Sequence, residues 1–316
     1  MTTIPYRSLC FAAALVAFIL GPSPAKSAEV PDSPSVQIFP LPTGVLPGEI
    51  AFDGANIWAT DFYYSTLVKF RASDGVVLGR YSGVYEPLRI ASNGTSVWAA
   101  TELGDLYKVR TSDGVVEQTI DLGTSPLGQV LFDGTNIWVA SWGLGNGLTK
   151  IEPSSGTILG TYTVGKSPFG LAFDGGNIWV TNSADDTVSK VRASDGQVLF
   201  TVPAGPSPWG IVYDGEGVWV ANSNSGRLTH LRASDGATLG VARAGSNPQL
   251  LTFDGHSVWA GDWAPDSIVQ RFHPRNPAHQ HLFREGTDPE GILFDGTSIW
   301  IAYEGSGTLC KITPGP

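Results

Sequence analysis

Short apolar runs separated by turn-forming residues extend along most of the chain. Runs of four to eight residues, such as 177–181 and 187–191, carry the alternating pattern of β-strands. The 39 glycines and 22 prolines supply many turns, and charged residues make up only 15% of the sequence. The pattern predicts an all-β protein of short strands joined by tight turns.

An aromatic-Asp-Gly-x-x-Ile/Val-Trp unit repeats seven times at intervals of 40 or 41 residues. Only the second copy is degraded, because it reads Ser92-Asn93-Gly94 where the others carry an aromatic residue, Asp and Gly. A period of this length indicates one supersecondary unit per repeat. The copies end at Trp58, Trp98, Trp138, Trp179, Trp219, Trp259 and Trp300.

Two further markers keep the same period. A Gly-x-x-Pro element, such as 165–168, precedes each unit, and an Arg-Ala-Ser-Asp-Gly turn follows it at 71–75, 192–196 and 232–236. Asp-Gly pairs favour hairpin turns, because Gly accepts a positive φ and Asp bonds its own backbone. Each repeat therefore contains four strands. Seven such antiparallel units predict a seven-bladed β-propeller in which the repeated tryptophans pack between blades.

The two ends of the chain together complete the last blade. The final repeat supplies strand sequence only as far as Thr313, whereas Val36 to Gly44 aligns without a gap onto 197–205, the fourth strand of blade 4. We expect the N-terminal strand to pair with the last one and close the ring, which removes an open sheet edge.

Residues 1–27 have the organisation of a signal peptide. Arg7 is followed by an apolar run over 9–20 and by Ala25-Lys26-Ser27, a small-x-small cleavage site. The run is shorter than the roughly 20 residues of a membrane span. We expect a secreted or periplasmic protein whose single propeller domain covers 28–316.

Charge and cysteine content narrow the possible partners. Cleavage removes two basic residues and leaves 17 against 29 acidic ones, a formal charge of −12. This charge disfavours nucleic acid and anionic membranes as partners. Cys10 leaves with the signal peptide, so Cys310 has no disulfide partner within the chain. We expect a monomer without disulfides and without membrane insertion.

The repeat sequence, for example 165–180, resembles the seven-bladed propellers of the NHL, YVTN and streptogramin (virginiamycin B) lyase group. The resemblance covers 36–316 and implies the fold. The group contains binding modules, scaffolds and enzymes, so it does not imply one activity.

A candidate ligand-binding site follows from repeat positions that vary between copies. These positions lie just after each repeated Trp or Pro and are expected on the face opposite the Asp-Gly turns. They mix aromatic rings with carboxylates, which suits a glycan, a peptide or a protein ligand. The predicted contacts are Asp61, Phe62, Glu102, Trp142, Trp209, Asp262, Trp263, Glu290, Tyr303 and Glu304.

For an enzyme, the resemblance implies a streptogramin lyase-like reaction that uses a histidine base and a divalent metal. None of the five histidines maps to the varied face, and His230 takes the strand position held by Lys69 and Lys190. His273, His279 and His281 form an alternative zinc-binding spacing, and Asp61, Asp262 and Asp185-Asp186 are alternative calcium ligands. The sequence therefore favours a non-enzymatic recognition or scaffold propeller, with a metal-assisted lyase or lactonase as the alternative and a divalent cation as a possible cofactor.

Overall fold

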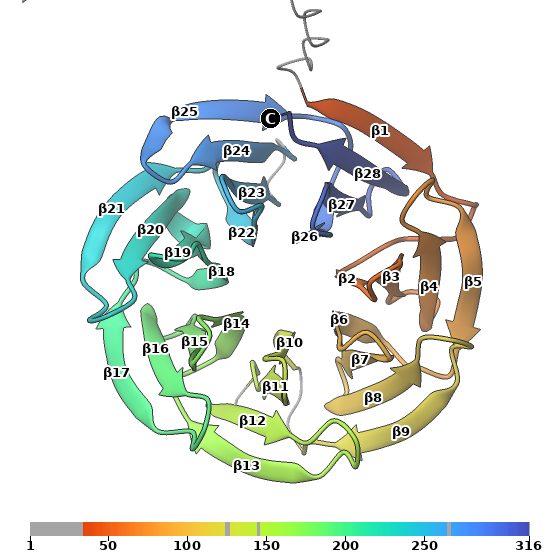
Figure 1. Cartoon of the computed structure of the whole chain (residues 1–316), viewed down its shortest axis with the longest axis horizontal. Coiled ribbons are helices and arrows are strands. Elements are labelled where there is room, and N and C mark those ends of the chain that lie inside the picture. Colours follow the sequence, from red (N-terminus) through yellow and green to blue (C-terminus); the bar gives the residue numbers. More distant parts are fainter. Residues whose placement is uncertain (1–33, 124–126, 144–145, 264–266, 316) are drawn as a thin grey trace, which may run out of the picture.

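Seven four-stranded antiparallel sheets form a ring around a central channel (Figure 1). The structure is a computed structural model that describes residues 34–123, 127–143, 146–263 and 267–315, without the side chains of 277–279. The first strand of each sheet lies innermost and the fourth outermost. This arrangement confirms the predicted all-β, seven-bladed propeller, while the predicted signal peptide lies outside the described residues.

The blades follow one another along the chain. Blade 1 contains β2 (Ile50–Phe52), β3 (Asn56–Asp61), β4 (Thr66–Arg71) and β5 (Val77–Ser82). Blade 2 contains β6 (Pro87–Ser92), β7 (Ser96–Thr101), β8 (Asp105–Arg110) and β9 (Val116–Asp121). Blade 3 contains β10 (Val130–Phe132), β11 (Ile137–Ala140), β12 (Gly147–Ile151) and β13 (Ile158–Thr163). Blade 4 contains β14 (Pro168–Phe173), β15 (Asn177–Asn182), β16 (Thr187–Arg192) and β17 (Val198–Pro203).

The second half of the ring repeats this order. Blade 5 contains β18 (Pro208–Tyr213), β19 (Gly217–Asn222), a short 3-10 helix (Ser223–Ser225), β20 (Arg227–Arg232) and β21 (Thr238–Arg243). Blade 6 contains β22 (Pro248–Phe253), β23 (Val258–Asp262), β24 (Val269–His273) and β25 (Asn276–Phe283). Blade 7 contains β26 (Pro289–Phe294), β27 (Ile299–Tyr303), β28 (Thr308–Thr313) and β1 (Ser35–Pro40). No helix among the described residues is long and apolar enough to cross a membrane.

The ring closes through the N-terminal strand, as the alignment predicts. β1 pairs antiparallel with β28 over six residues, from Ser35 opposite Thr313 to Pro40 opposite Thr308. Phe39 stacks on Trp300 with ring centroids 5.8 Å apart. A Cβ on Gly75, whose φ is +70°, would clash with the Phe39 ring, so this Gly is needed for both its backbone and its size.

The hydrophobic core lies between the blades. All seven repeated tryptophans are 0–1% exposed. Trp179 of blade 4, for example, packs in one cluster with Ile211 and Val218 of blade 5. The second strands are consequently covered on both faces by neighbouring blades.

A basic residue stands directly opposite each repeated Trp on the third strand. In blade 4, Lys190 Nζ lies 4.8 Å from the Trp179 ring centroid and 2.9 Å from Asp174 Oδ2, and it donates to the Ala233 carbonyl of blade 5 at 2.7 Å. Trp179 Nε1 donates to the same Asp174 oxygen at 2.9 Å. The Asp174 turn of blade 4 therefore also anchors the junction with blade 5. The seven paired residues are Lys69, Lys108, Lys150, Lys190, His230, Arg271 and Lys311.

The degraded second repeat lacks one of these bonds. Asn93 Oδ1 accepts from the backbone of Thr95 and Ser96, as the aspartates of the other turns do from theirs. Trp98 Nε1 is buried and has no hydrogen-bond partner among the described residues. The Trp indoles of the other six blades all donate to an Asp at 2.7–2.9 Å.

The two faces of the ring carry different connections. The turn face holds the hairpins that join first to second strands and third to fourth strands. The loop face holds the second-to-third-strand loops and the connections between blades. On the loop face these two kinds of segment bond to each other, as Ser183 N does to Ser167 O and Glu304 N to Asp288 O.

Candidate functional site

A belt of polar side chains lines the central channel near the loop face. Four blades contribute polar side chains to it from the start of their innermost strands, and the space that they enclose measures only about 40 Å³. Blades 4 and 5 present Gly170 and Gly210 there, where a Cβ would clash with the backbone of the next blade. The polar residues that line it are Glu49, Arg89, Gln129 and Gln249, and the charge of Glu290 in blade 7 acts on Glu49 from close by.

Glu49 is the most perturbed acidic group of this belt. Its Oε2 accepts a hydrogen bond from Ile90 N at 2.9 Å, and Gln129 also bonds to it. Burial raises the pKa of Glu49 to about 7, against the opposing effect of the Arg89 charge and the two hydrogen bonds. Glu49 can therefore gain or lose a proton near neutral pH.

Arg89 links the acidic belt to an aromatic wall. Its guanidinium carbon lies 4.8 Å from the ring centroid of Phe169, which belongs to blade 4. Its charge acts on both Glu49 and Glu290 and lowers the pKa of each, although burial still leaves both values raised. Arg89 Nε is buried without a hydrogen-bond partner among the described residues.

The aromatic wall consists of Trp142, Phe169 and Trp209. The ring centroids are 5.8 Å apart for Trp142 and Phe169, 5.5 Å for Trp142 and Trp209, and 4.1 Å for Phe169 and Trp209. Phe169 is buried, whereas both Trp rings are partly exposed. Trp142 comes from the second-to-third-strand loop of blade 3 and Trp209 from β18 of blade 5. The structure thus brings together two predicted site residues from non-adjacent blades.

A cluster of acidic side chains from blade 7 and aromatic rings from blades 1 and 6 lies on the same face. Trp263, 48% exposed, donates from Nε1 to Glu290 Oε1 at 2.5 Å. The Tyr63 hydroxyl bonds to Glu304, and Tyr63 itself is 65% exposed. Burial, with the nearby charge of Asp288, raises the pKa of both glutamates, and Glu304 further raises that of Glu290. Two carboxylates are therefore held beside exposed aromatic rings.

Three predicted contacts are buried in the structure. Asp61 is fully buried and pairs with Arg80 at 3.2 Å. Asp262 is 1% exposed and accepts from the backbone of Ser246 and Asn247. Tyr303 is fully buried in the core of blade 7. These side chains anchor the loop-face segments.

The other predicted residues occupy intermediate positions. Phe62 is half-buried and packs edge-on against Tyr63 with centroids 5.6 Å apart. Glu102 is also half-buried, and its backbone N donates to the Glu86 carbonyl. The sequence prediction did not include Glu49, Arg89, Gln129 or Tyr63. Glu49 and Arg89 could have been identified from the repeats, because most copies have Gly two positions after the Pro, where these two residues stand.

The histidines lie away from this site. His230 stacks on Trp219 at 4.4 Å and lies 3.1 Å from Asp214. His256 and His273 are on the turn face, and the His279 side chain of the predicted zinc spacing is outside the described residues. Within the described part of the chain, no three His, Cys, Asp or Glu side chains gather as metal ligands. The described residues therefore do not fit the metal site that the resemblance implies.

Known protein structures share the fold of this chain. No family model and no curated protein matched the chain. A solved streptogramin B lyase has a TM-score of 0.75 at 16% identity, covering 89% of this chain and 97% of its own. Virginiamycin B lyase from Staphylococcus aureus has a TM-score of 0.76 at 18% identity, covering 89% and 99%. Hydrazine synthase from Kuenenia stuttgartiensis has a TM-score of 0.75 at 15% identity, covering 86% and 96%. At these identities the likeness concerns the fold alone, so the chain shares the seven-bladed propeller of the streptogramin lyase-like proteins.

Proposed function

We propose that this protein is an exported, non-enzymatic recognition propeller that binds a glycan or peptide at the channel mouth on its loop face. The observation that carries the proposal is the Trp142–Phe169–Trp209 wall on the same face as the Glu290 and Glu304 carboxylates. Six loop-face side chains that sequence variation alone selected take part in or adjoin these groups. They are Phe62, Trp142, Trp209, Trp263, Glu290 and Glu304.

The chemistry of the mouth suits a ligand with hydroxyl groups or positive charge. Partly exposed Trp rings supply stacking area for sugar C–H faces or apolar side chains. Carboxylates accept hydrogen bonds from hydroxyls and pair with ammonium or guanidinium groups. Three carboxyl groups, Glu49, Glu290 and Glu304, lie on this side of the ring with one guanidinium, Arg89, so the mouth disfavours an anionic ligand.

The experiment is a glycan and peptide array probed with residues 28–316, followed by affinity measurement for the strongest hit. Trp142→Ala and Trp263→Ala should each raise Kd by tenfold or more, since a buried interface Trp is worth about 2 kcal/mol or more. Leu239→Ala on the outer strand β21 is the control, because Leu239 is an exposed apolar residue far from the mouth. Unchanged affinity in both Trp variants, with the melting temperature preserved, would contradict the proposal.

A lyase or lactonase is the second candidate, and Glu49 is the observation that favours it. A carboxyl group with a pKa of about 7 can act as a general base at neutral pH. Opening of a streptogramin B lactone by the protein, abolished in Glu49→Gln and retained in Leu239→Ala, would establish this alternative. No lactone opening together with Trp-dependent glycan or peptide binding would support the recognition function.

A further inference from the structure

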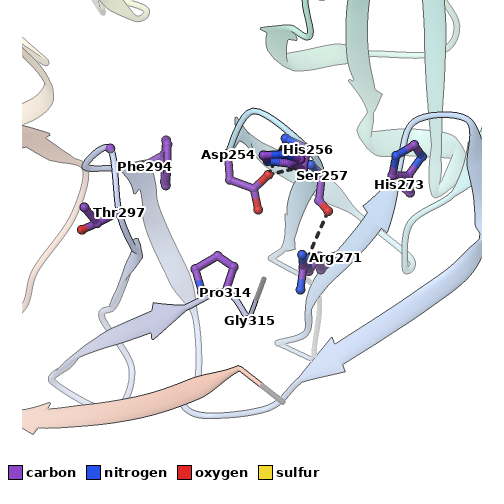
Figure 2. A pocket seen from close by; sticks show the side chains of 10 residues that line it. Asp254, His256, Ser257, Arg271, His273, Phe294, Thr297, Pro314 and Gly315 are labelled. Carbon is purple, nitrogen blue, oxygen red and sulfur yellow. Dashed lines mark hydrogen bonds between the residues drawn. The ribbon is translucent and has the colours of Figure 1, made fainter. Parts of the chain in front are cut away.

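A separate cavity opens on the turn face, between blades 6 and 7 (Figure 2). Its volume is about 650 Å³. Two Asp-Gly turns form its walls, 254–257 from blade 6 and 294–297 from blade 7. Arg271 and His273 of β24 and the C-terminal segment at Pro314 and Gly315 complete the lining. We call this space the seam cavity.

The seam cavity exists because the ring is closed from both ends of the chain. At the junction of blades 4 and 5, the third-to-fourth-strand turn 232–236 covers the corresponding space, and Lys190 donates to its Ala233 carbonyl. The lysines at 69, 150 and 311 bond in the same way to the next blade. In blade 7, β28 and β1 come from opposite ends of the chain and are not joined by a turn, so no third-to-fourth-strand turn of the described residues covers this side of blade 6.

Arg271 occupies the position of these lysines and is left incompletely paired. Its guanidinium lies 5.5 Å from the Trp259 centroid, and Nε donates to Ser257 Oγ at 3.1 Å. Its two terminal nitrogens have no partner among the described residues. Asp254 in the adjoining turn is the equivalent of Asp174, and it accepts from Trp259 Nε1 at 2.8 Å and from Ser257 N at 2.6 Å. Among the described residues it forms no ion pair with Arg271, whereas Lys190 and Asp174 are 2.9 Å apart.

We infer that the seam cavity binds a small organic carboxylate, which pairs with the terminal nitrogens of Arg271 while its apolar part packs on Phe294 and Pro314. A guanidinium with two free terminal nitrogens matches the geometry of a carboxylate. His256 and His273 add further N–H donors to the lining. The apolar ring and proline favour an acid with a hydrocarbon body over inorganic phosphate.

The test uses 3-phenylpropanoate as a probe and its neutral amide as the matched ligand, with calorimetry on the full mature chain. The parent should bind the carboxylate saturably and the amide at least about tenfold more weakly. Arg271→Gln should raise the Kd of the carboxylate at least about tenfold. Arg232→Gln is the control, because Arg232 is an exposed turn-face arginine paired with Asp235 and has the same charge change.

Three results would overturn the inference. These are equal affinity for the carboxylate and the amide, the same Kd in the 271 and 232 variants, or no saturable binding by the parent. Tighter binding of inorganic phosphate than of the carboxylate would contradict the ligand class.

Arg271→Lys introduces the residue that five other blades carry at this position and so keeps the Trp259 packing. Because Lys lacks the planar fork, this variant should also weaken binding, and it separates loss of the site from loss of folding.

Discussion

Replacing Asn93 by Asp should stabilise the second blade, because it supplies the acceptor that Trp98 lacks. Asn93 uses its oxygen for the turn, and the other amide atom is a nitrogen that cannot accept from the buried indole N–H. A buried donor left unpaired costs about 1–3 kcal/mol, and bonds to charged acceptors are stronger than neutral ones. Lys108 lies 5.6 Å from the Trp98 centroid and would neutralise the new charge.

The new carboxylate must also be desolvated, which offsets part of this gain. In blades 1 and 4 the equivalent aspartates have side chains only 3% and 6% exposed. We therefore expect a net increase of about 1–2 kcal/mol in the free energy of unfolding. This corresponds to a rise of about 2–8 °C in melting temperature.

Differential scanning calorimetry on the parent, Asn93→Asp and the reciprocal Asp133→Asn tests this reasoning. Asp133 accepts from Trp138 Nε1 at 2.7 Å, so its loss should destabilise blade 3 by about 1–3 kcal/mol. An Asn93→Asp variant no more stable than the parent, alongside a destabilised Asp133→Asn, would show that a carboxylate acceptor does not stabilise the blade 2 turn.

Two further predictions concern ring closure and the channel belt. Deleting 34–42 removes β1, exposes the edge of β28 and uncovers Trp300, so melting temperature should fall and size-exclusion chromatography should show aggregates; a stable monomer would refute this. Glu49 has a folded-state pKa of about 7 against a usual 4.5, so its contribution to stability is complete below pH 4.5 and is lost as pH rises to 7, by at most about 3 kcal/mol. The stability of Glu49→Gln relative to the parent should therefore increase across that interval in urea unfolding at several pH values, and a pH-independent difference would show that the Glu49 pKa is not raised.

The fold could be predicted because local and global signals in the repeats agree. The Asp-Gly turns, the alternating runs and the 40-residue period each indicate the same four-stranded unit, and the gapless alignment of the N-terminal segment identified the closing strand. The packing of the seven tryptophans between blades followed from their period alone. The basic partner of each Trp was only partly predictable. The sequence shows that Lys69, Lys190 and His230 occupy the same repeat position, but it does not show that they contact the Trp ring.

The site was less predictable, because variation between repeats does not measure exposure. Asp61, Asp262 and Tyr303 end second strands, which neighbouring blades cover on both faces, so the period-two rule for a half-buried strand does not apply to them. Glu49 and Arg89 were missed for the converse reason. They lie in the narrow channel, where seven innermost strands converge and a single side chain meets residues from several blades.

The two faces of the ring differ in how freely their sequence can vary. On the turn face, the Asp of the first-to-second-strand turn bonds both its own backbone and a buried Trp in six blades, as Asp174 does in blade 4, so these residues repeat. The loop face has no such repeated bond to a buried Trp among the described residues. The seam is the exception on the turn face. A ring closed by joining the two ends of the chain lacks one inter-strand turn, so the basic residue of blade 6 meets an open cavity instead of a backbone carbonyl. The same closure that protects the sheet edge thereby creates the place where the repeated face can acquire a specific ligand.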